Sequence, residues 1–172
     1  MIKKSEKGIG LIEVLVYVGV FSLIIVVVTS FVFWFIRSNA KAKVMREVLD
    51  SSKRVMDLIT QEIKESDYVY LPTASATQLS LKTKKYPAPG EEFSYLDFYL
   101  CDSRVCMKKE SQDPIYLTPE NIEVNNLVFT QITSGDYLSI RINLGVNYNN
   151  INNRPEYEAS IDLTSAASSR SY

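Results

Sequence analysis

The chain has 172 residues, with 19 lysines and arginines against 20 aspartates and glutamates, so its net charge is -1. This length suits one globular domain with room for a membrane element, and the balanced charge argues against a protein held on nucleic acid by bulk charge. The lack of histidine excludes histidine-based acid–base catalysis, a Ser-His-Asp triad and most catalytic zinc sites. Two cysteines are too few for a disulfide scaffold or a four-cysteine zinc site.

A long apolar run follows the first residues, which include three lysines. Between Glu13 and Arg37 stand 23 uncharged residues, none of them proline. As a helix they would extend about 35 Å, enough to cross a hydrocarbon layer of about 30 Å. We therefore predict that residues 9–36 form a transmembrane helix, because a domain of this size cannot bury so long a helix that is apolar on every face.

Two ordinary explanations of this run fit less well. A secretory signal peptide has an apolar region of about 7–15 residues and a small-residue cleavage site, whereas this run is longer and ends in Trp34, Phe35 and Ile36. A plain signal anchor explains the run but has no use for Glu13, whose burial in lipid would cost about 2–3 kcal/mol. Basic residues both precede and follow the run, so their count does not set its orientation.

The sequence KGIGLIE at residues 7–13 resembles the leader junction of type IV prepilins and pseudopilins. The resemblance implies that prepilin peptidase removes residues 1–8 by cutting between Gly8 and Ile9. It implies further that the new amine of Ile9 is N-methylated and that Glu13 is the glutamate that this family has as the fifth residue of the mature chain. The leader would then lie in the cytoplasm, and the C-terminal domain outside the cytoplasmic (inner) membrane.

The role of Glu13 can also be argued from physical chemistry. An apolar helix in lipid has no preferred register against identical neighbours, but a buried carboxylate strongly favours a partner cation. The processed helix offers one cation at that depth, the terminal amine of Ile9. Pairing between subunits would fix the axial step of assembly, although Ile9 of the same chain lies one turn away. The alternative is that Glu13 is an interfacial residue without a role.

Residues 37–71 have the pattern of an amphipathic helix. No glycine or proline occurs between Gly19 and Pro72. We predict one helix from about Ile9 to about Ser66, with an apolar stripe that packs on the domain's own sheet. A break within residues 37–40 is left open. The stripe follows a period of 3.6 and consists of Val44, Val48, Leu49, Val55, Met56, Ile59 and Ile63.

Residues 72–164 alternate in the manner of short strands separated by turns, so the fold class is α+β with the long helix packed on an antiparallel β-sheet. Residues 165–172 are predicted to be a disordered tail. The predicted strands are 79–81, 93–101, 105–108, 122–133, 137–148 and 157–164, and strict apolar alternation from Leu138 to Val146 is the clearest signal. The order of segments 117–121, 125–129 and 157–163 resembles W-type minor pilins and J-type minor pseudopilins.

Other candidate sites lie in this β-rich region. Cys101 and Cys106 flank a predicted hairpin turn and could form a disulfide outside the cytoplasm, with two free thiols as the alternative. The asparagines of 149–153 lack the aspartate pair of a calcium site, and no metal site is predicted. A group of lysines near tyrosines 86, 95 and 99 could bind DNA. The favoured interpretation is a solvated sheet edge, which the lysines protect from pairing with the strands of other chains. These lysines are Lys82, Lys84, Lys85, Lys108 and Lys109.

Together these patterns predict a minor pilin or pseudopilin, a structural subunit of a type IV pilus-like or type II secretion filament. Its expected partners are prepilin peptidase, other pilin subunits, the membrane platform of the assembly machine and the lipid bilayer. No cofactor is expected. A second class is a signal-anchored extracytoplasmic binding or adhesion domain that does not polymerise. An anchored enzyme is disfavoured because the sequence shows no nucleophile–base pair.

Overall fold

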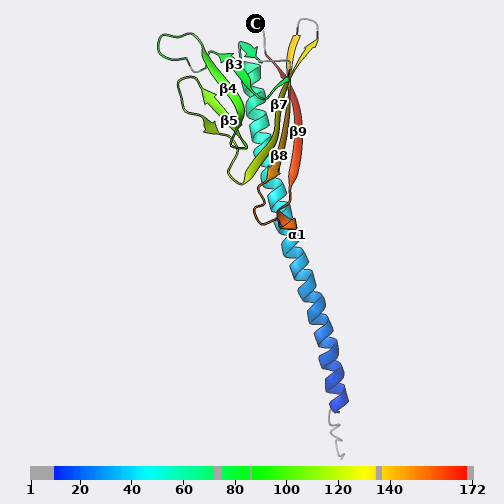
Figure 1. The fold of residues 1–172 in the computed structure, drawn as a ribbon. Helices are drawn as coiled ribbons and strands as arrows, with labels where there is room; N and C mark the ends of the chain where they lie inside the picture. Colours follow the sequence, from blue (N-terminus) through cyan, green and yellow to red (C-terminus); the bar gives the residue numbers. More distant parts are fainter. Residues whose placement is uncertain (1–9, 72–74, 86, 135–136, 170–172) are drawn as a thin grey trace, which may run out of the picture. The chain divides into compact units, whose positions relative to one another are not determined.

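The computed structural model describes residues 10–71, 75–85, 87–134 and 137–169. Within these residues it is an α+β protein with one long helix, α1 (Leu11–Glu65), and nine strands in two antiparallel sheets (Figure 1). The chain divides into two units, one ending at Ala40 and the other beginning at Lys41, and α1 contributes residues to both. The predicted fold class is therefore confirmed.

The strands form a five-stranded and a four-stranded sheet. The first has the order β1-β3-β4-β5-β6, formed by Tyr68–Tyr70, Leu79–Thr83, Ser94–Cys101, Arg104–Lys109 and Ile115–Tyr116. The second has the order β2-β7-β8-β9, formed by Ser75–Ala76, Ile122–Ser134, Tyr137–Tyr148 and Ser160–Ser168. A short 3-10 helix, η1 (Pro155–Tyr157), lies between β8 and β9.

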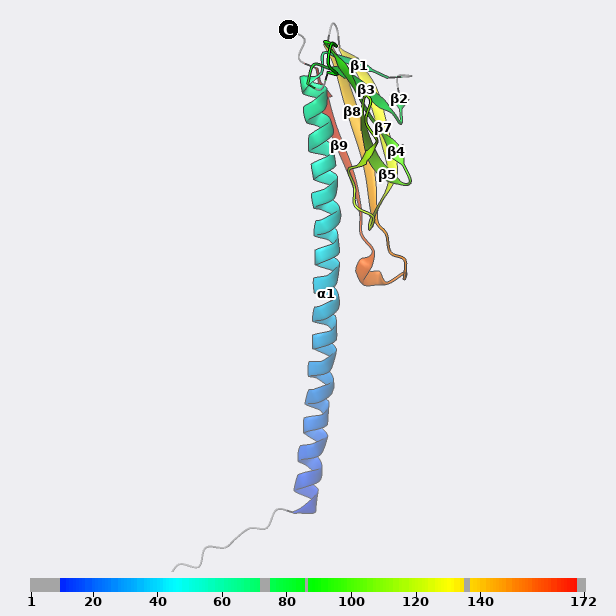
Figure 2. The ribbon, with the colours of Figure 1, turned by 90° about the vertical axis from the view of Figure 1, so that its left-hand side faces the viewer.

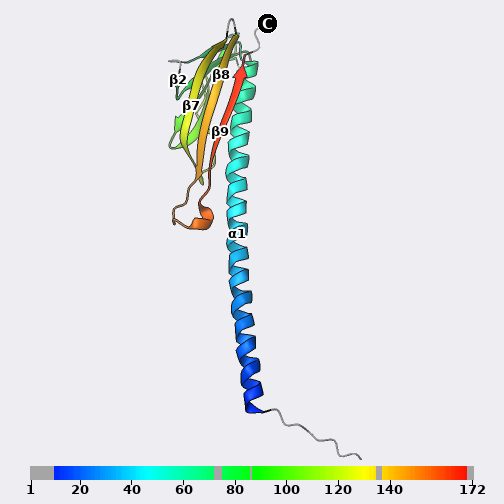
Figure 3. The same ribbon diagram turned by 90° about the vertical axis from the view of Figure 1, so that its right-hand side faces the viewer.

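The core of the second unit lies between α1 and the two sheets. Both sheets are on one side of α1 in this unit, as Figures 2 and 3 show from opposite directions. Phe98 of β4 and Phe129 of β7 are fully buried, so each sheet contributes a large aromatic side chain. Most of the predicted helical stripe is buried in this core, which confirms its packing role, whereas its member Leu49 is only partly buried. The buried members are Val44, Val48, Val55, Met56, Ile59 and Ile63.

The alternation predicted for β8 is also confirmed. Ile140, Ile142, Leu144 and Val146 are all buried, because side chains two residues apart face the same side of a strand. β8 begins and ends at the predicted residues. It pairs with β7 on one side and with β9 on the other, so it lies inside the sheet.

A β-bulge interrupts the pairing of β7 with β8. The register shifts between Val124 and Asn126, so that Asn125 is the additional residue opposite Gly145. A methyl group at Gly145 would contact the side chains of Asn125 and Asp162. Glycine therefore makes room for both polar side chains over the bulge.

The structure differs from the sequence-based predictions at several places. α1 ends at Glu65, one residue before the predicted end. β9 extends to Ser168, so the prediction of a disordered tail is wrong for residues 165–168, which pair with β8 from Ser139 to Ile142. Strands β1, β2 and β6 were not predicted, because two or three residues are too few to show a period.

Candidate functional site: an apolar helical segment with one carboxylate

The first part of α1 presents its side chains to the outside on all faces. Residues 10–39 are all exposed. Among the large apolar side chains the exposed fraction runs from 47% at Val32 to 85% at Leu11. Soluble monomers rarely expose so much contiguous apolar surface, so this segment needs a membrane or protein partner. By length and composition α1 can cross a membrane, and none of the span is buried by the chain itself.

Three hydroxyl side chains within this segment donate hydrogen bonds to its own backbone. Ser22 Oγ donates to Gly19 O at 2.8 Å, Thr29 Oγ1 to Ile25 O at 2.7 Å, and Ser30 Oγ to Val26 O at 2.8 Å. A hydroxyl that is hydrogen-bonded in this way has no unsatisfied donor in a medium without water. These three residues are therefore compatible with hydrocarbon surroundings.

Glu13 is the one charged residue of α1 before Arg37, and it lies in the first helical turn. Its backbone N–H donates to Gly10 O at 2.9 Å, and its side chain is exposed. A carboxylate in the first turn is favoured by the positive end of the helix dipole. No ion pair of Glu13 is formed with the described residues. Gly8 and Ile9, the predicted cleavage and methylation residues, lie outside the described residues.

Cys101 and Cys106 form a disulfide across the hairpin of β4 and β5, with Cα atoms 5.9 Å apart. Asp102 and Ser103 form the tight turn between the strands, and both have positive φ, 47° and 57°. The carbonyl of Ser103 accepts a hydrogen bond of 2.7 Å from the N–H of Val124, next to the bulge in β7. The disulfide thus closes a hairpin whose turn connects the two sheets.

The predicted lysine edge is largely occupied by local contacts. The Nζ of Lys82 lies 3.8 Å from the ring centre of Phe93, and that of Lys84 lies 5.3 Å from it. Lys84 also lies 3.9 Å from a carboxylate oxygen of Asp67. Tyr86 lies outside the described residues. Because β3 pairs with β1 on one side and with β4 on the other, Lys82 does not lie on a sheet edge, and the interpretation of a guarded edge is wrong for this residue. DNA binding by these lysines stays a prediction without a supporting contact.

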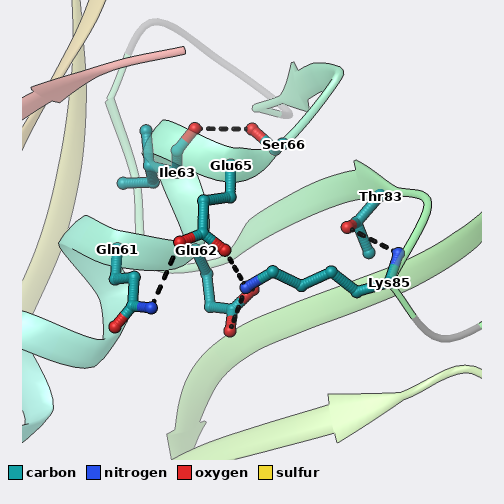
Figure 4. A network of polar contacts seen from close by, with 7 residues as sticks. All are labelled: Gln61, Glu62, Ile63, Glu65, Ser66, Thr83 and Lys85. Carbon is teal, nitrogen blue, oxygen red and sulfur yellow. Dashed lines mark hydrogen bonds and ion pairs between the residues drawn. The ribbon is translucent and has the colours of Figure 1, made fainter. Parts of the chain in front are cut away.

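Lys85 joins the β3–β4 loop to the last turns of α1 (Figure 4). Its Nζ lies 3.0 Å from Glu62 Oε2 and also pairs with Glu65. Partial burial works against the charged ammonium, but the hydrogen bonds to Glu65 and Glu62 and their negative charges outweigh it, so the pKa of Lys85 is raised. This network has a structural role, because Glu62 is only 8% exposed and needs a cation.

A cluster of exposed tyrosines was not predicted from the sequence. The rings of Tyr68 and Tyr70 are 4.6 Å apart, and those of Tyr70 and Tyr95 are 6.2 Å apart. The three are 42–55% exposed on the outer face of the five-stranded sheet. Exposed tyrosines are enriched at binding surfaces. The alternation in Tyr68-Val69-Tyr70 was the available signal, but the cluster depends on the pairing of β1 and β4 with β3.

The asparagine-rich loop closes on itself. Asn150 Nδ2 donates to Arg154 O at 2.8 Å, and Asn150 Oδ1 accepts from Arg154 N at 3.0 Å. This pairing makes the side-chain oxygen of Asn150 an acceptor within the loop itself. Among the described residues there is no group of three or more His, Cys, Asp and Glu side chains placed to hold a metal ion.

The chain matches no protein-family model, and no curated protein or solved structure is significantly similar to it. The assignment of a function therefore depends on the residues and their geometry. What they define is an α+β protein whose N-terminal helix is long and apolar enough for single-pass membrane anchoring.

Proposed function

We propose that this protein is a minor pilin or pseudopilin, a non-catalytic subunit of a type IV pilus-like or type II secretion filament. The observation that carries the proposal is the apolar segment of α1, exposed on every face, with a single carboxylate in its first turn. A membrane anchor needs the apolar surface only. A subunit that must stop at one register beside its neighbours also needs a polar group within that surface.

Processing would create the partner of this carboxylate. Prepilin peptidase would cut between Gly8 and Ile9, and the terminal amine of Ile9 would be N-methylated. Glu13 of one subunit would then pair with the amine of Ile9 in the next. A carboxylate at membrane depth costs about 2–3 kcal/mol, so a neighbour that supplies a cation is strongly favoured over one that does not.

The remaining parts of the chain would have the corresponding roles. Before assembly the subunit would wait in the cytoplasmic membrane with the domain from Lys41 outside the cytoplasm, where the Cys101–Cys106 disulfide is stable. Other pilin subunits would replace lipid around the apolar segment during assembly. The membrane platform of the assembly machine would deliver the subunit to the filament.

The test separates processing from assembly. In cells that contain prepilin peptidase, intact mass should show the loss of MIKKSEKG and the gain of one methyl group. Glu13→Gln should be cleaved normally but should not enter filaments, and Thr29→Val in the same segment should do both normally. Normal incorporation of Glu13→Gln would show that this carboxylate does not set the register.

A second candidate is a signal-anchored binding domain that does not polymerise. The exposed cluster of Tyr68, Tyr70 and Tyr95 favours it, because such surfaces suit recognition of an external partner. An anchor of this kind keeps its first residues. A mature protein that begins at Met1 in peptidase-containing cells would therefore support the second candidate and refute the first.

A further inference from the structure

The β8–β9 connection, residues 149–159, contains the asparagine-rich loop and η1 and lies at one end of the second unit. At its start, the N–H of its first residue donates to Asn121 O at 2.9 Å, and Asn121 Nδ2 donates to Glu47 Oε1 at 2.6 Å. β9 then leads to the opposite end, where Ser169 Oγ donates to Ser66 O at 2.7 Å, just after α1 ends. The connection therefore lies at the end where α1 enters the unit, as Figures 2 and 3 show.

Given the membrane anchoring on which the proposed function also rests, the chain itself keeps this end near lipid. The last apolar residue before Arg37 is Ile36, and the second unit begins at Lys41. α1 includes all of these residues, so at about 1.5 Å per residue Lys41 lies within about 8 Å of the hydrocarbon boundary. The β8–β9 connection is therefore at the membrane-proximal end of the unit.

The connection holds one apolar side chain out to the surroundings. Ile151 is 84% exposed, whereas the other exposed large apolar side chains described in the second unit are 41–55% exposed. The side chain of Asn150 holds the turn by hydrogen bonds of 2.8 and 3.0 Å with the backbone O and N–H of Arg154. The rings of Tyr148 and Tyr157, on either side of this turn, stack with their centres 6.1 Å apart. The tip is thus ordered before it meets a partner, which lowers the entropic cost of a contact.

Charged side chains accompany the exposed isoleucine. The cations at this end of the unit are Lys41, Lys43, Arg46 and Arg154. All four are exposed, and none forms an ion pair with the described residues. The carboxylates here are those of Glu47, Glu156 and Glu158. Because the two signs nearly balance, the apolar tip rather than net charge has to carry a contact with lipid.

We propose that the β8–β9 connection is a second membrane contact, with Ile151 in the interfacial region of the bilayer and Arg154 hydrogen-bonded to lipid phosphate. An apolar side chain near a guanidinium suits this region, because the first enters the acyl boundary and the second stays among the phosphates. One isoleucine is far too small a patch for a specific protein interface of about 800 Å² per partner. A lipid contact needs no more, because the anchor makes it intramolecular and raises the effective concentration of lipid.

The experiment measures lipid contact in the full chain, with one chain in each phosphatidylcholine nanodisc. The two native cysteines are bonded to each other, so a third cysteine can be labelled alone with nitrobenzoxadiazole. Asn152→Cys places the dye beside Ile151, Tyr68→Cys places it at the opposite end of the unit, and Thr29→Cys reports insertion of the apolar segment. Doxyl-labelled phospholipid should lower the fluorescence about twofold or more at positions 152 and 29 and leave it unchanged at position 68.

Matched substitutions identify the side chains responsible. In the labelled Asn152→Cys chain, Ile151→Asn should abolish the quenching, whereas Ile115→Asn, the same change at an exposed isoleucine of β6, should leave it unchanged. Arg154→Gln should reduce the quenching and keep the backbone hydrogen bonds of the turn. Arg141→Gln, at an exposed arginine of β8, should have no effect.

The outcomes separate this contact from the anchoring itself. Quenching at position 29 without quenching at position 152 would overturn the proposed contact and leave the anchoring intact. No quenching at either position would refute the anchoring as well. Equal quenching at positions 68 and 152, or quenching that persists in Ile151→Asn, would also overturn the contact. None of these readouts depends on cleavage after Gly8 or on the role of Glu13.

Discussion

The network of Lys85 with Glu62 and Glu65 predicts a measurable contribution to stability. In Lys85→Met the apolar part of the side chain is kept, but Glu62 loses its cation. Glu62 stays buried, because the residue as a whole is only 8% exposed. Removing one partner of a fully buried pair costs about 3–5 kcal/mol, whereas exposed pairs contribute about 0–1 kcal/mol. The side chains of Lys85 and Glu62 are 29% and 10% exposed, which places this pair between the two cases.

We therefore expect Lys85→Met to lower the free energy of unfolding by about 1–3 kcal/mol at pH 7. Urea unfolding of the full chain in micelles, followed by far-UV circular dichroism, measures this loss. A double-mutant cycle with Glu62→Gln isolates the pair, and the double variant should lose less than the sum of the two single losses. Equal stability of Lys85→Met and wild type would refute the reasoning.

The pH dependence of this contribution has a definite sign. Because the pKa of Lys85 is raised in the folded protein, the folded state holds this proton more tightly than the unfolded state. The contribution is fully present below the ordinary value of 10.5 and is lost as the pH rises through the raised value. The difference between wild type and Lys85→Met should stay constant from pH 6 to about 9.5 and shrink above pH 10.5. A difference that is still undiminished well above the raised pKa would contradict the assigned cause.

Two further substitutions and the reduction of the disulfide test the packing of the domain by urea unfolding. Phe129→Ala should lower the free energy of unfolding by about 3–5 kcal/mol, because Phe129 is fully buried; a loss below 1 kcal/mol would contradict its place in the core. Gly145→Ala should cost about 1–3 kcal/mol by crowding the bulge, and adding Asn125→Ala should recover part of that loss if the steric cause is right. Reducing the Cys101–Cys106 disulfide should cost about 2 kcal/mol, with a Cys106→Ser variant unaffected by reductant as the control.

The periodic parts of the fold were predictable from the sequence. The apolar stripe gave the end of α1 to within one residue, and the alternation in β8 gave both of its ends. The extension of β9 was not predictable, because Ser165 to Ser168 are small residues without a pattern. They are held by pairing with β8 and by burial of Ala167, which is 4% exposed. Tertiary contacts here outweigh local preference.

The candidate sites also differ in how far the sequence alone predicts them. Glu13 could be singled out from the sequence because a lone charge in an apolar run is a local feature. The exposed cluster of Tyr68, Tyr70 and Tyr95 could not, because its residues are brought together by the pairing of β1 and β4 with β3.

Two glutamates of α1 show how a carboxylate's surroundings indicate where its partner comes from. Glu62 is buried and finds its cation within the chain, at Lys85. Glu13 is exposed in an apolar segment and forms no ion pair with the described residues, and under the proposed function its counterpart is the amine of Ile9 in a neighbouring subunit. Glu62→Gln should therefore destabilise the domain in urea, whereas Glu13→Gln should leave its unfolding midpoint unchanged and impair assembly alone. A lowered midpoint in Glu13→Gln would show that this carboxylate serves the fold of its own chain, which would remove the physical basis for pairing between subunits.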